Sequence, residues 1–464
     1  MAVESTTDAA GRSPSELSIA IIGAGMGGLG CALALAKKGF TDIQVYETAS
    51  NLGFVGAGIQ MAPNLVRILT RWDCWDKIAA DSTDVRETSI RDGASNTELT
   101  HVDMGNIRDK YGFPHCTGHR ASLAGGLYDG CRKESAITFH FGHALVSVDT
   151  FSPKPTFTIQ TRDSRTRQVT ADVLVAADGV KSLTRNALLS QLGLAAEAEP
   201  TGQAAYRVML PREKMESDPD MMALLDSNQV TRWIGERRHW IAYPIHGRQI
   251  YNMSSIQPDV NFEAPSLSAT YTTKGSKSAM LSVFDDFCPL VKKMLDLVPD
   301  GEVCEWKLHV HKPLPTWSHG SVALLGDACH PTLPHLNQGA AMAIEDGAVL
   351  AEVLARVPLP ASDSMGEQTA RAISKALAVY EELRKERTST LVDLAAFSGR
   401  TLHLGEGKAK EERDRQFAEA KKNGGNVPDK WASPDVQKMI YTHDCMQVAA
   451  ERFQELYCAA TAES

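Results

Sequence analysis

Several features are scarce in this 464-residue sequence, and each scarcity excludes a class of protein. Basic residues are not in the majority, because 48 Lys and Arg stand against 57 Asp and Glu, giving a formal net charge of −9. Nucleic-acid binders normally carry a basic surface, so we expect no nucleic-acid partner. No apolar run reaches the roughly 18 residues of a membrane span. Residues 1–16 lack the basic start and apolar stretch of a signal peptide, so we expect a cytoplasmic protein.

Paired cysteines are also missing. The nine cysteines are dispersed and include no Cys-x-x-Cys motif. An odd, scattered set is typical of reduced thiols and argues against a disulfide framework or a dithiol redox centre. His309 and His311 lie two residues apart, but no third ligand has a suitable spacing. We therefore expect no metal site.

The composition, with 43% hydrophobic and 23% charged residues, is that of an ordinary globular protein. The length exceeds what one compact core usually serves. We expect a monomer or homodimer built from a first nucleotide-binding part, a β-rich substrate domain, a second nucleotide-binding part and a C-terminal helical region, at 17–200, 201–310, 311–360 and 361–464.

The first unit has the pattern of a dinucleotide-binding fold. An apolar strand over residues 17–22 leads directly into Gly23-Ala24-Gly25-Met26-Gly27-Gly28, a helix and a second strand that ends at Glu47. This order predicts an α/β, Rossmann-type fold. Gly23 permits the tight turn, Gly25 lets the backbone approach a pyrophosphate, and Gly28 lets the helix pack on the strand. Glu47 is placed to accept from an adenosine ribose hydroxyl.

Two further buried strands end in glycine–aspartate turns. Residues 173–177 are followed by Asp178-Gly179, and residues 322–325 are followed by Gly326-Asp327-Ala328-Cys329-His330-Pro331. A polar turn then continues through Asn337-Gln338 into a helix that begins near Gly339. No second glycine-rich fingerprint follows a strand, so one dinucleotide fold is expected.

With these three ordered motifs, residues 17–400 resemble the single-component FAD-dependent aromatic hydroxylases, a family that includes salicylate hydroxylase and 3-hydroxybenzoate 6-hydroxylase. The resemblance implies an FAD-binding domain, a β-sheet substrate domain and a helical C-terminal region. It implies that NAD(P)H reduces the FAD, that O₂ forms a flavin 4a-hydroperoxide, and that a small phenolic, hydroxybenzoate-like substrate is hydroxylated, with decarboxylation left open. Epoxidation or dearomatising hydroxylation of a larger secondary metabolite is the alternative reaction, and a nucleotide-binding regulator without turnover is the alternative class.

The resemblance also implies specific cofactor contacts. Asp327 would bind the ribityl chain, and Asp178 with Gly179 would serve the pyrophosphate region and NAD(P)H. Further contacts with FAD are implied for residues in the later motifs and in shorter echoes of the family pattern, namely Gly58 within the segment Gly56–Gln60, Arg120, Val146 at the adenine, and Gly339 and Ala340 at the isoalloxazine.

Candidate substrate residues lie in the β-rich segment and the third turn. His239 and Tyr243 are four apart and share one face of a regular strand, and in the family such a pair orients and deprotonates the phenol. Core packing of both side chains is the structural alternative. Gln338 and His335 are candidates to contact the substrate, and Arg207 is a candidate to pair either with a substrate carboxylate or within a structural ion pair.

The C-terminal region is predicted to be mostly helical. Ile373, Leu377 and Tyr380 form an apolar stripe, and Glu381, Arg384 and Arg387 are expected on the solvent side. Residues 406–433 are charged and punctuated by Gly and Pro, which predicts a long exposed loop or arm. A last helix is expected over about 434–458.

Overall fold

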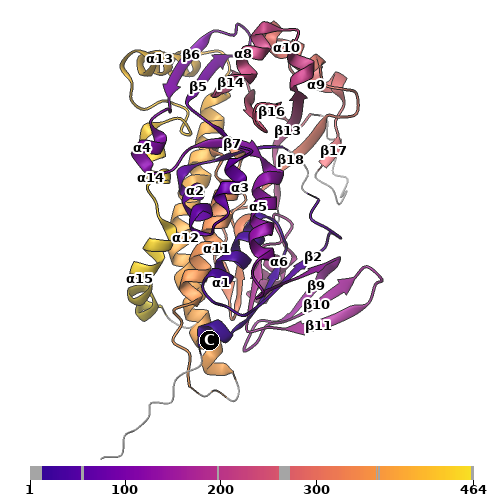
Figure 1. Cartoon of the computed structure of the whole chain (residues 1–464), viewed down its shortest axis with the longest axis vertical. Coiled ribbons are helices and arrows are strands. Elements are labelled where there is room, and N and C mark those ends of the chain that lie inside the picture. Colours follow the sequence, from indigo (N-terminus) through magenta and orange to yellow (C-terminus); the bar gives the residue numbers. More distant parts are fainter. Residues whose placement is uncertain are drawn as a thin grey trace, which may run out of the picture.

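The computed structural model describes residues 13–53, 57–195, 198–260, 272–361, 363 and 366–460. Its parallel sheet lies beside the helices α1 and α11 in the lower half of Figure 1. The sheet has the strand order β19-β20-β12-β1-β2-β8. These strands are β1 (Ser18–Ile22), β2 (Asp42–Glu47), β8 (Ile137–Phe141), β12 (Val173–Ala176), β19 (Ser318–His319) and β20 (Val322–Leu324).

The three predicted turns leave neighbouring strands of this sheet. β1 pairs in parallel with β2 and β12, and β12 pairs in parallel with β20. Because the carboxyl ends of parallel strands meet at one edge, turns that are about 150 residues apart in the chain lie side by side. The predicted Rossmann-type α/β fold is confirmed, whereas the predicted segment boundaries stay predictions.

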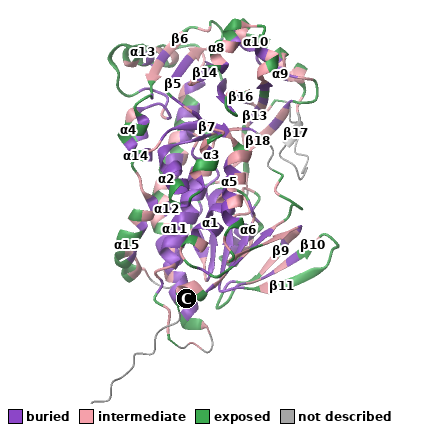
Figure 2. Ribbon diagram, in the orientation of Figure 1, coloured by how far each residue is buried: buried purple, intermediate pink, exposed green. Residues whose placement is uncertain are grey.

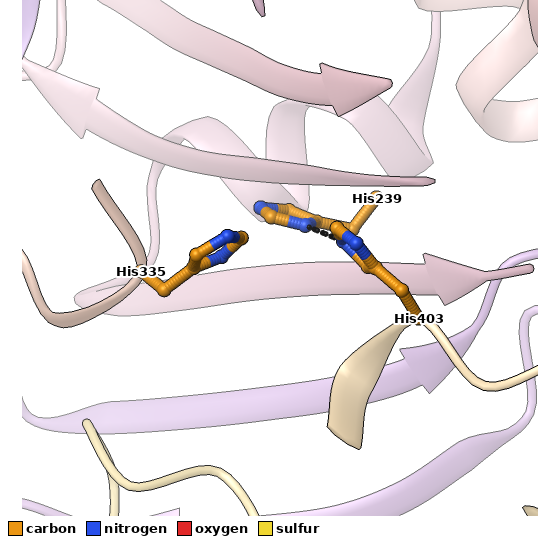
Figure 3. Close-up of side chains that lie close together, drawn as sticks. All are labelled: His239, His335 and His403. Atoms are coloured by element: carbon orange, nitrogen blue, oxygen red, sulfur yellow. Dashed lines mark hydrogen bonds between the residues drawn. The ribbon is translucent and has the colours of Figure 1, made fainter. Parts of the chain in front are cut away.

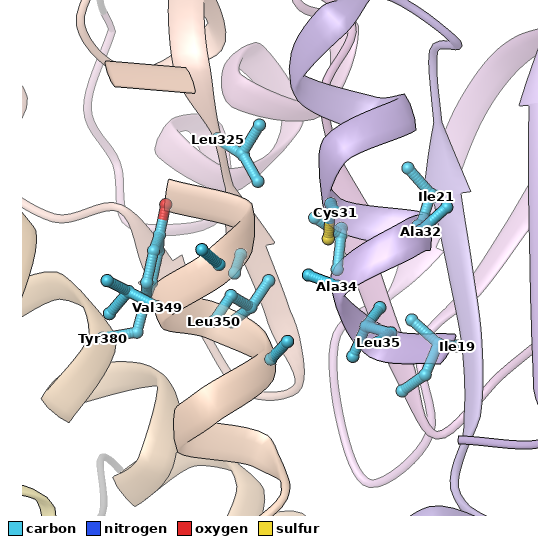
Figure 4. Packing of buried hydrophobic residues seen from close by; sticks show 14 of the residues in the cluster. Ile19, Ile21, Cys31, Ala32, Ala34, Leu35, Leu325, Val349, Leu350 and Tyr380 are labelled. Atoms are coloured by element: carbon cyan, nitrogen blue, oxygen red, sulfur yellow. The ribbon is translucent and has the colours of Figure 1, made fainter. Parts of the chain in front are cut away.

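Helices α1 (Met26–Lys37) and α11 (Gly339–Leu354) form the centre of the nucleotide-binding core. Almost every residue of α11 is buried (Figure 2). Leu325 and Leu350 face Cys31 and Ala34 across this contact (Figure 4). A Cβ on Gly347 would lie 2.7 Å from the Cα of Cys31, so the close approach of the two helices requires glycine there.

The second large sheet has eight strands in the order β17-β18-β13-β16-β15-β14-β5-β6. The β-rich segment predicted for residues 201–310 is present and its strands pair antiparallel, but two earlier strands join them, with β5 parallel to β14. The strands are β5 (Glu87–Asp92), β6 (Glu98–Asp103), β13 (Glu199–Pro211), β14 (Gln229–Gly235), β15 (Arg238–Ile245), β16 (Ile250–Pro258), β17 (Thr272–Lys274) and β18 (Cys304–Val310).

Each of the two large sheets is the centre of one lobe of the molecule. Two small sheets and several short helices complete these two lobes. One sheet contains β9 (His143–Thr150), β10 (Thr156–Thr161) and β11 (Thr166–Thr170), and the other contains β3 (Gly58–Met61), β4 (Thr83–Asp84) and β7 (Cys116–His119). The remaining helices are η1 (Pro14–Glu16), α2 (Pro63–Arg71), α3 (Trp75–Ala79), α4 (Ile107–Tyr111), α5 (Arg120–Arg132), α6 (Leu183–Gln191), α7 (Arg212–Met215), α8 (Pro219–Leu225), α9 (Lys277–Val283), α10 (Pro289–Asp296), η2 (Gly326–Ala328) and η3 (Pro334–Leu336).

The C-terminal region is helical, as predicted, and contains α12 (Glu367–Leu402), α13 (Lys408–Asn423), α14 (Pro434–Tyr441) and α15 (Cys445–Ala459). The long α12 runs along the molecule from the nucleotide-binding core toward the large sheet (Figure 1). Across the part of the chain described here, no helix is both long and apolar enough to cross a membrane.

Three expectations for this region are wrong. Arg384 is wholly buried because carboxylates of α11 pair with it. Residues 406–433 contain α13, whose charges pair along the helix, as between Lys410 and Asp414, while Phe417 packs inward. The last helix is two helices, since Asp444 caps a new start by accepting from the backbone N–H of Gln447.

Candidate functional site

The first glycine-rich turn has the geometry that its sequence predicts. Gly23 adopts a φ of +99°, in the region that favours glycine. A Cβ on Gly28 would lie 2.0 Å from the carbonyl oxygen of Gly23, so only glycine lets α1 begin this close to the turn. Gly25 caps α1 without a side-chain hydrogen bond, and the space above its Cα is open. The free N–H groups of the helix start therefore face a space that can hold an anion.

Glu47 stands at the end of β2 beside this helix start. Its carboxylate accepts from the backbone N–H of Ala24 and of Ala49, each at 2.8 Å. These bonds orient the side chain toward a cavity of about 490 Å³ that Glu47 helps to line. Trp306 of β18 forms part of the opposite wall, and no sequence signal pointed to it because it lies on the other sheet.

A second cavity of about 380 Å³ continues from the first. Both are lined by Gly25, Met26, Arg120 and Arg207, so they form one extended groove. The structure brings most of the predicted cofactor residues to this second cavity, namely Gly25, Gly58, Arg120, Gly179, Asp327, Gly339 and Ala340. Gly56, from the predicted flavin loop, lies outside the described residues.

Two arginines supply positive charge where the cavities meet. Arg120 begins α5 and Arg207 lies on β13, and neither guanidinium has an ion pair within the described ranges. Arg207 stacks on the Trp306 ring, with 4.6 Å from guanidinium carbon to ring centroid. Burial, together with the charge of Arg120, lowers the pKa of Arg207 to about 10, and burial also lowers the pKa of Arg120. Both side chains stay cationic at neutral pH and face the junction.

The two predicted aspartates have different settings. Asp178 accepts from the backbone N–H and the hydroxyl of Thr184, at 3.2 and 3.1 Å, so it caps the turn before α6. Asp327 projects into the second cavity from η2. Although the cavity leaves the Asp327 carboxylate accessible, the surrounding protein desolvates it and raises its pKa, as burial does for Asp178. Asp327 is thus free to receive donors from a ligand.

Asp346 of α11 supports the turn that carries Asp327. Its carboxylate accepts from the backbone N–H of Gly326 at 3.0 Å and from the ring of His330 at 2.5 Å. Arg384 donates to the same carboxylate at 2.7 Å from α12. His330 is therefore structural, since it helps to hold the turn rather than facing the cavity.

The start of α11 forms the floor of the second cavity. Gly339 and Ala340 line it. Gln338 is the N-cap residue of the helix, but its side chain makes no capping hydrogen bond. Gln338 itself does not line the cavity, because its side-chain amide oxygen accepts from the side-chain nitrogen of Asn64 at 3.1 Å inside the protein. Asn337 does line it, with a φ of +54° and a buried side-chain amide nitrogen that has no hydrogen-bond partner among the described residues. This unsatisfied donor belongs to a residue in the wall where the resemblance puts the isoalloxazine.

Tyr243 reaches the same cavity from β15. A Cβ on Gly58 would lie 2.6 Å from the Tyr243 ring and 2.4 Å from the side chain of Asn252, so glycine is required where β3 meets the large sheet. Asn252 accepts from the backbone N–H of Gly58 at 2.7 Å and ties the two lobes together. No local sequence pattern points to Asn252, because its role depends on contact between distant strands.

His239 and Tyr243 share a strand face but not a cavity. His239 lines neither half of the groove, and its Nδ1 lies 2.7 Å from Nε2 of His403. His335 lies beside them (Figure 3) and lines a separate cavity of about 390 Å³. Burial lowers the pKa of His403 to about 3 and lowers those of His239 and His335 as well.

Two other predicted positions lie apart from the groove. Val146 on β9 is 49% exposed and lines neither half of it. His309 and His311 belong to none of the groups of three possible metal ligands found among the described residues. The nitrogen Nδ1 of each ring instead lies near a backbone carbonyl, that of Lys307 and that of Lys312.

The groove fits an extended dinucleotide such as FAD. Glu47 would hold an adenosine ribose at one end, Arg120 and the α1 start would hold a pyrophosphate, and Asp327, Asn337 and the α11 start surround the other end. The chemistry of this donor set, with two helix N-termini and two unpaired guanidiniums, suits a molecule that carries two phosphates between two polar ends.

Comparisons with known proteins agree with this geometry. The family described as FAD binding domain matches residues 16–230. The FAD-dependent monooxygenase OpS4 of Beauveria bassiana is 31% identical over 93% of this chain and 96% of the relative. The 3-hydroxybenzoate 6-hydroxylase 1 of Aquipseudomonas alcaligenes is 30% identical over 84% of this chain and 91% of the relative.

A solved structure of a salicylate hydroxylase substrate complex has the same fold. It superimposes with a TM-score of 0.74 at 22% identity, covering 97% of this chain and 100% of that chain. The fold, the groove and the relatives that match nearly the whole sequence lead to one conclusion. The chain belongs to the family of FAD-dependent monooxygenases.

Proposed function

We propose that this enzyme hydroxylates a small phenolic, hydroxybenzoate-like substrate, with NAD(P)H as the reductant and O₂ as the oxygen source. The observation that carries the proposal is the position of Tyr243 and Arg207 in the wall of the cavity that also contains Asp327 and the α11 start. A phenol donor and a cation therefore line the cavity in which we propose that the flavin ring binds. A relative named for 3-hydroxybenzoate hydroxylation supports an aromatic acid as the substrate.

The chain's own groups would hold the cofactor along the groove. Glu47 would accept from the ribose, Gly25 and the α1 N–H groups would donate to the pyrophosphate, and Arg120 would offset its charge. Asp327 would accept from the ribityl hydroxyls. Gly339 and Ala340 would donate from the backbone, and Asn337 would donate from its unpartnered amide to a ring acceptor. Bound FAD, once reduced, would supply the activation of O₂ for oxygen transfer.

Tyr243 would act on the substrate as a hydrogen-bond donor. Burial raises the pKa of Tyr243 although the nearby Arg207 opposes this effect, so the phenol stays protonated at neutral pH. A protonated phenol can hold a substrate oxygen but cannot remove its proton. Arg207 would attract the negative charge of a substrate carboxylate or phenolate. Walls contributed by both lobes would keep bulk water away from the reacting atoms.

The test is a substrate panel with the FAD-loaded enzyme. NADH and NADPH oxidation is followed with hydroxybenzoates, matched phenols without the carboxylate, and bulky non-carboxylated aromatic compounds. We expect one or more hydroxybenzoates to accelerate coenzyme oxidation and to give a hydroxylated product in proportion to the coenzyme consumed. Turnover of the bulky compounds alone would contradict the proposal and favour the alternative reaction on larger metabolites.

A further inference from the structure

Three histidines from distant parts of the chain converge beside the flavin groove (Figure 3). His239 lies on β15, His335 follows Pro334 in η3, and His403 caps the C-terminus of α12. They are 2%, 1% and 8% exposed. One nitrogen from each ring lies within 4.8 Å of the other two, and His239 Nδ1 is 2.7 Å from His403 Nε2.

The backbone around the cluster holds the rings close together. A Cβ on Gly399 of α12 would lie 2.5 Å from His335 Nε2, so the absence of a side chain makes room for this ring against the helix. The carbonyl of His403 accepts from the backbone N–H of Arg237 at 3.0 Å, which ties the end of α12 to the turn before β15. The convergence therefore does not depend on a single flexible side chain.

The cluster has an unsatisfied member. Both ring nitrogens of His335 are buried and have no hydrogen-bond partner in the described part of the chain. A buried ring nitrogen without a partner costs free energy, which a ligand that binds its lone pair would recover. His335 and His403 also line the cavity of about 390 Å³, which gives a small ligand a route to the rings.

We propose that His239, His335 and His403 bind one divalent transition-metal ion, with Zn²⁺ as the best-suited case. Three imidazole nitrogens are a known zinc donor set, and Zn–N bonds of about 2.1 Å require nitrogens about 3.4 Å apart in a tetrahedral site. The 2.7 Å between His239 Nδ1 and His403 Nε2 is shorter than this value, and the ligand nitrogens all lie within 4.8 Å of one another, so ring rotations that open the His239–His403 hydrogen bond would complete the geometry. The fourth position faces the cavity and takes water or an anion.

Neighbouring charge permits a cation at this place. Arg232 is a buried cation whose charge acts on His239 and His335, and its guanidinium is paired with Asp429 at 2.6 Å. Arg413 approaches His403, and its guanidinium is paired with Asp414 at 2.7 Å. Arg237 and Arg400 line the cavity mouth and would favour an anion as the fourth ligand.

The site is separate from the flavin groove but shares a wall with it. Thr332 and Pro334 line the groove, whereas Leu333 and His335, which alternate with them, line the other cavity. A bound ion would join this wall to β15 and to α12. Its role is then to fix the wall and the contact between the two lobes, and the proposal does not depend on the identity of the aromatic substrate.

Metal binding by the FAD-loaded full-length protein tests the proposal. After chelator treatment and its removal, Zn²⁺ binding is measured by calorimetry and by metal analysis, and Co²⁺ is added as a spectroscopic probe. We expect one ion per chain. At wavelengths longer than the flavin absorbance, we expect the visible bands of four-coordinate, nitrogen-bound Co²⁺. His335→Gln and His403→Gln should each weaken Zn²⁺ binding at least 10-fold, while the control H309Q/H311Q should not.

Folding of each variant is checked by its FAD content and circular dichroism. If one variant fails to fold, the other carries the comparison, and the Co²⁺ spectrum of the unaltered enzyme stands without either. Absence of stoichiometric binding would overturn the proposal. The proposal would also be overturned if the folded His335 and His403 variants bound Zn²⁺ as tightly as the unaltered enzyme, or if the control H309Q/H311Q lost binding. Either result places the ion elsewhere.

Discussion

Arg384 of α12 donates to Asp346 of α11 at 2.7 Å, and both side chains are completely buried. The same carboxylate accepts from the backbone of Gly326, one residue before Asp327. A helix from the C-terminal region thus supports, through one carboxylate, the turn that carries Asp327. The pair explains why Arg384 lies inside the protein although its spacing along α12 predicts the solvent side.

Replacing Arg384 with Met should destabilise the enzyme strongly. The change leaves Asp346 and Glu345 buried with fewer partners, and removing one member of a buried ion pair costs about 3–5 kcal/mol. Urea denaturation of the FAD-free protein measures the loss. Arg415→Met is the matched control, because Arg415 pairs with Glu412 at an exposed place on α13 and should change stability by about 0.5 kcal/mol or less. Equal effects of the two changes would contradict the assignment.

The same network predicts sensitivity to acid. Burial alone would raise the pKa of Glu345, but Arg387 and Arg384 outweigh it and hold the pKa below its usual range. Burial opposes a lowered pKa of Asp346 too, and His330 and Arg384 outweigh it there. Because the folded-state pKa values are lowered, the stabilisation is present above the unfolded values near about 4 and is lost as pH falls through the folded values.

Urea midpoints measured from pH 7 to pH 3 check this expectation. We expect a steep fall below about pH 4.5, where the unfolded carboxylates begin to take up protons that the folded ones resist. Glu345→Gln should lower stability at pH 7 and flatten the acid limb. A midpoint that stays constant down to pH 3 would show that the two carboxylates contribute nothing.

Alanine at Gly28 and at Gly25 should separate folding from cofactor binding. At Gly28 the new Cβ would overlap the carbonyl oxygen of Gly23, so we expect a loss of about 1–3 kcal/mol or more in the FAD-free protein. At Gly25, φ is −70° and no neighbouring atom lies within 4 Å of the position that a Cβ would take. The free energy of unfolding of the FAD-free protein should therefore hardly change. The Kd for FAD should nevertheless rise at least about 10-fold, or about 1.4 kcal/mol, because the Cβ enters the groove. Flavin fluorescence titration and urea denaturation measure the two effects.

Removal of the Tyr243 hydroxyl should slow turnover and leave FAD in place. Tyr243→Phe takes away one donor in the cavity, a loss that typically costs about 10²-fold in kcat. The rate of product formation at saturating substrate is the measurement, with the flavin spectrum as the check on binding. Tyr251→Phe, in the neighbouring strand β16 and away from the groove, is the control. Similar turnover for the two variants would remove Tyr243 from the mechanism.

Local sequence patterns predicted the nucleotide-binding part well. The strand–turn–helix order around Gly23 and Gly28 depends on backbone conformation and close packing within a few residues, so it can be read directly from the chain. Local patterns fail to predict burial where the charge of a distant residue decides it. Arg384 has a solvent-side spacing on α12, and only the carboxylates of α11 make burial favourable. The charged residues of α13 and the Gly and Pro residues after it favour a loop by sequence alone, so the helix was not predicted.

The amino-acid sequence by itself determined that one glycine-rich turn and two glycine–aspartate turns exist and that each follows a buried strand. Tertiary structure alone decided which side chains share a space with them. Tyr243 faces the groove, whereas His239, four residues earlier on the same strand face, contacts His403 from the end of α12. The physical reason is that strand periodicity specifies a face, while the element packed on that face changes along its length.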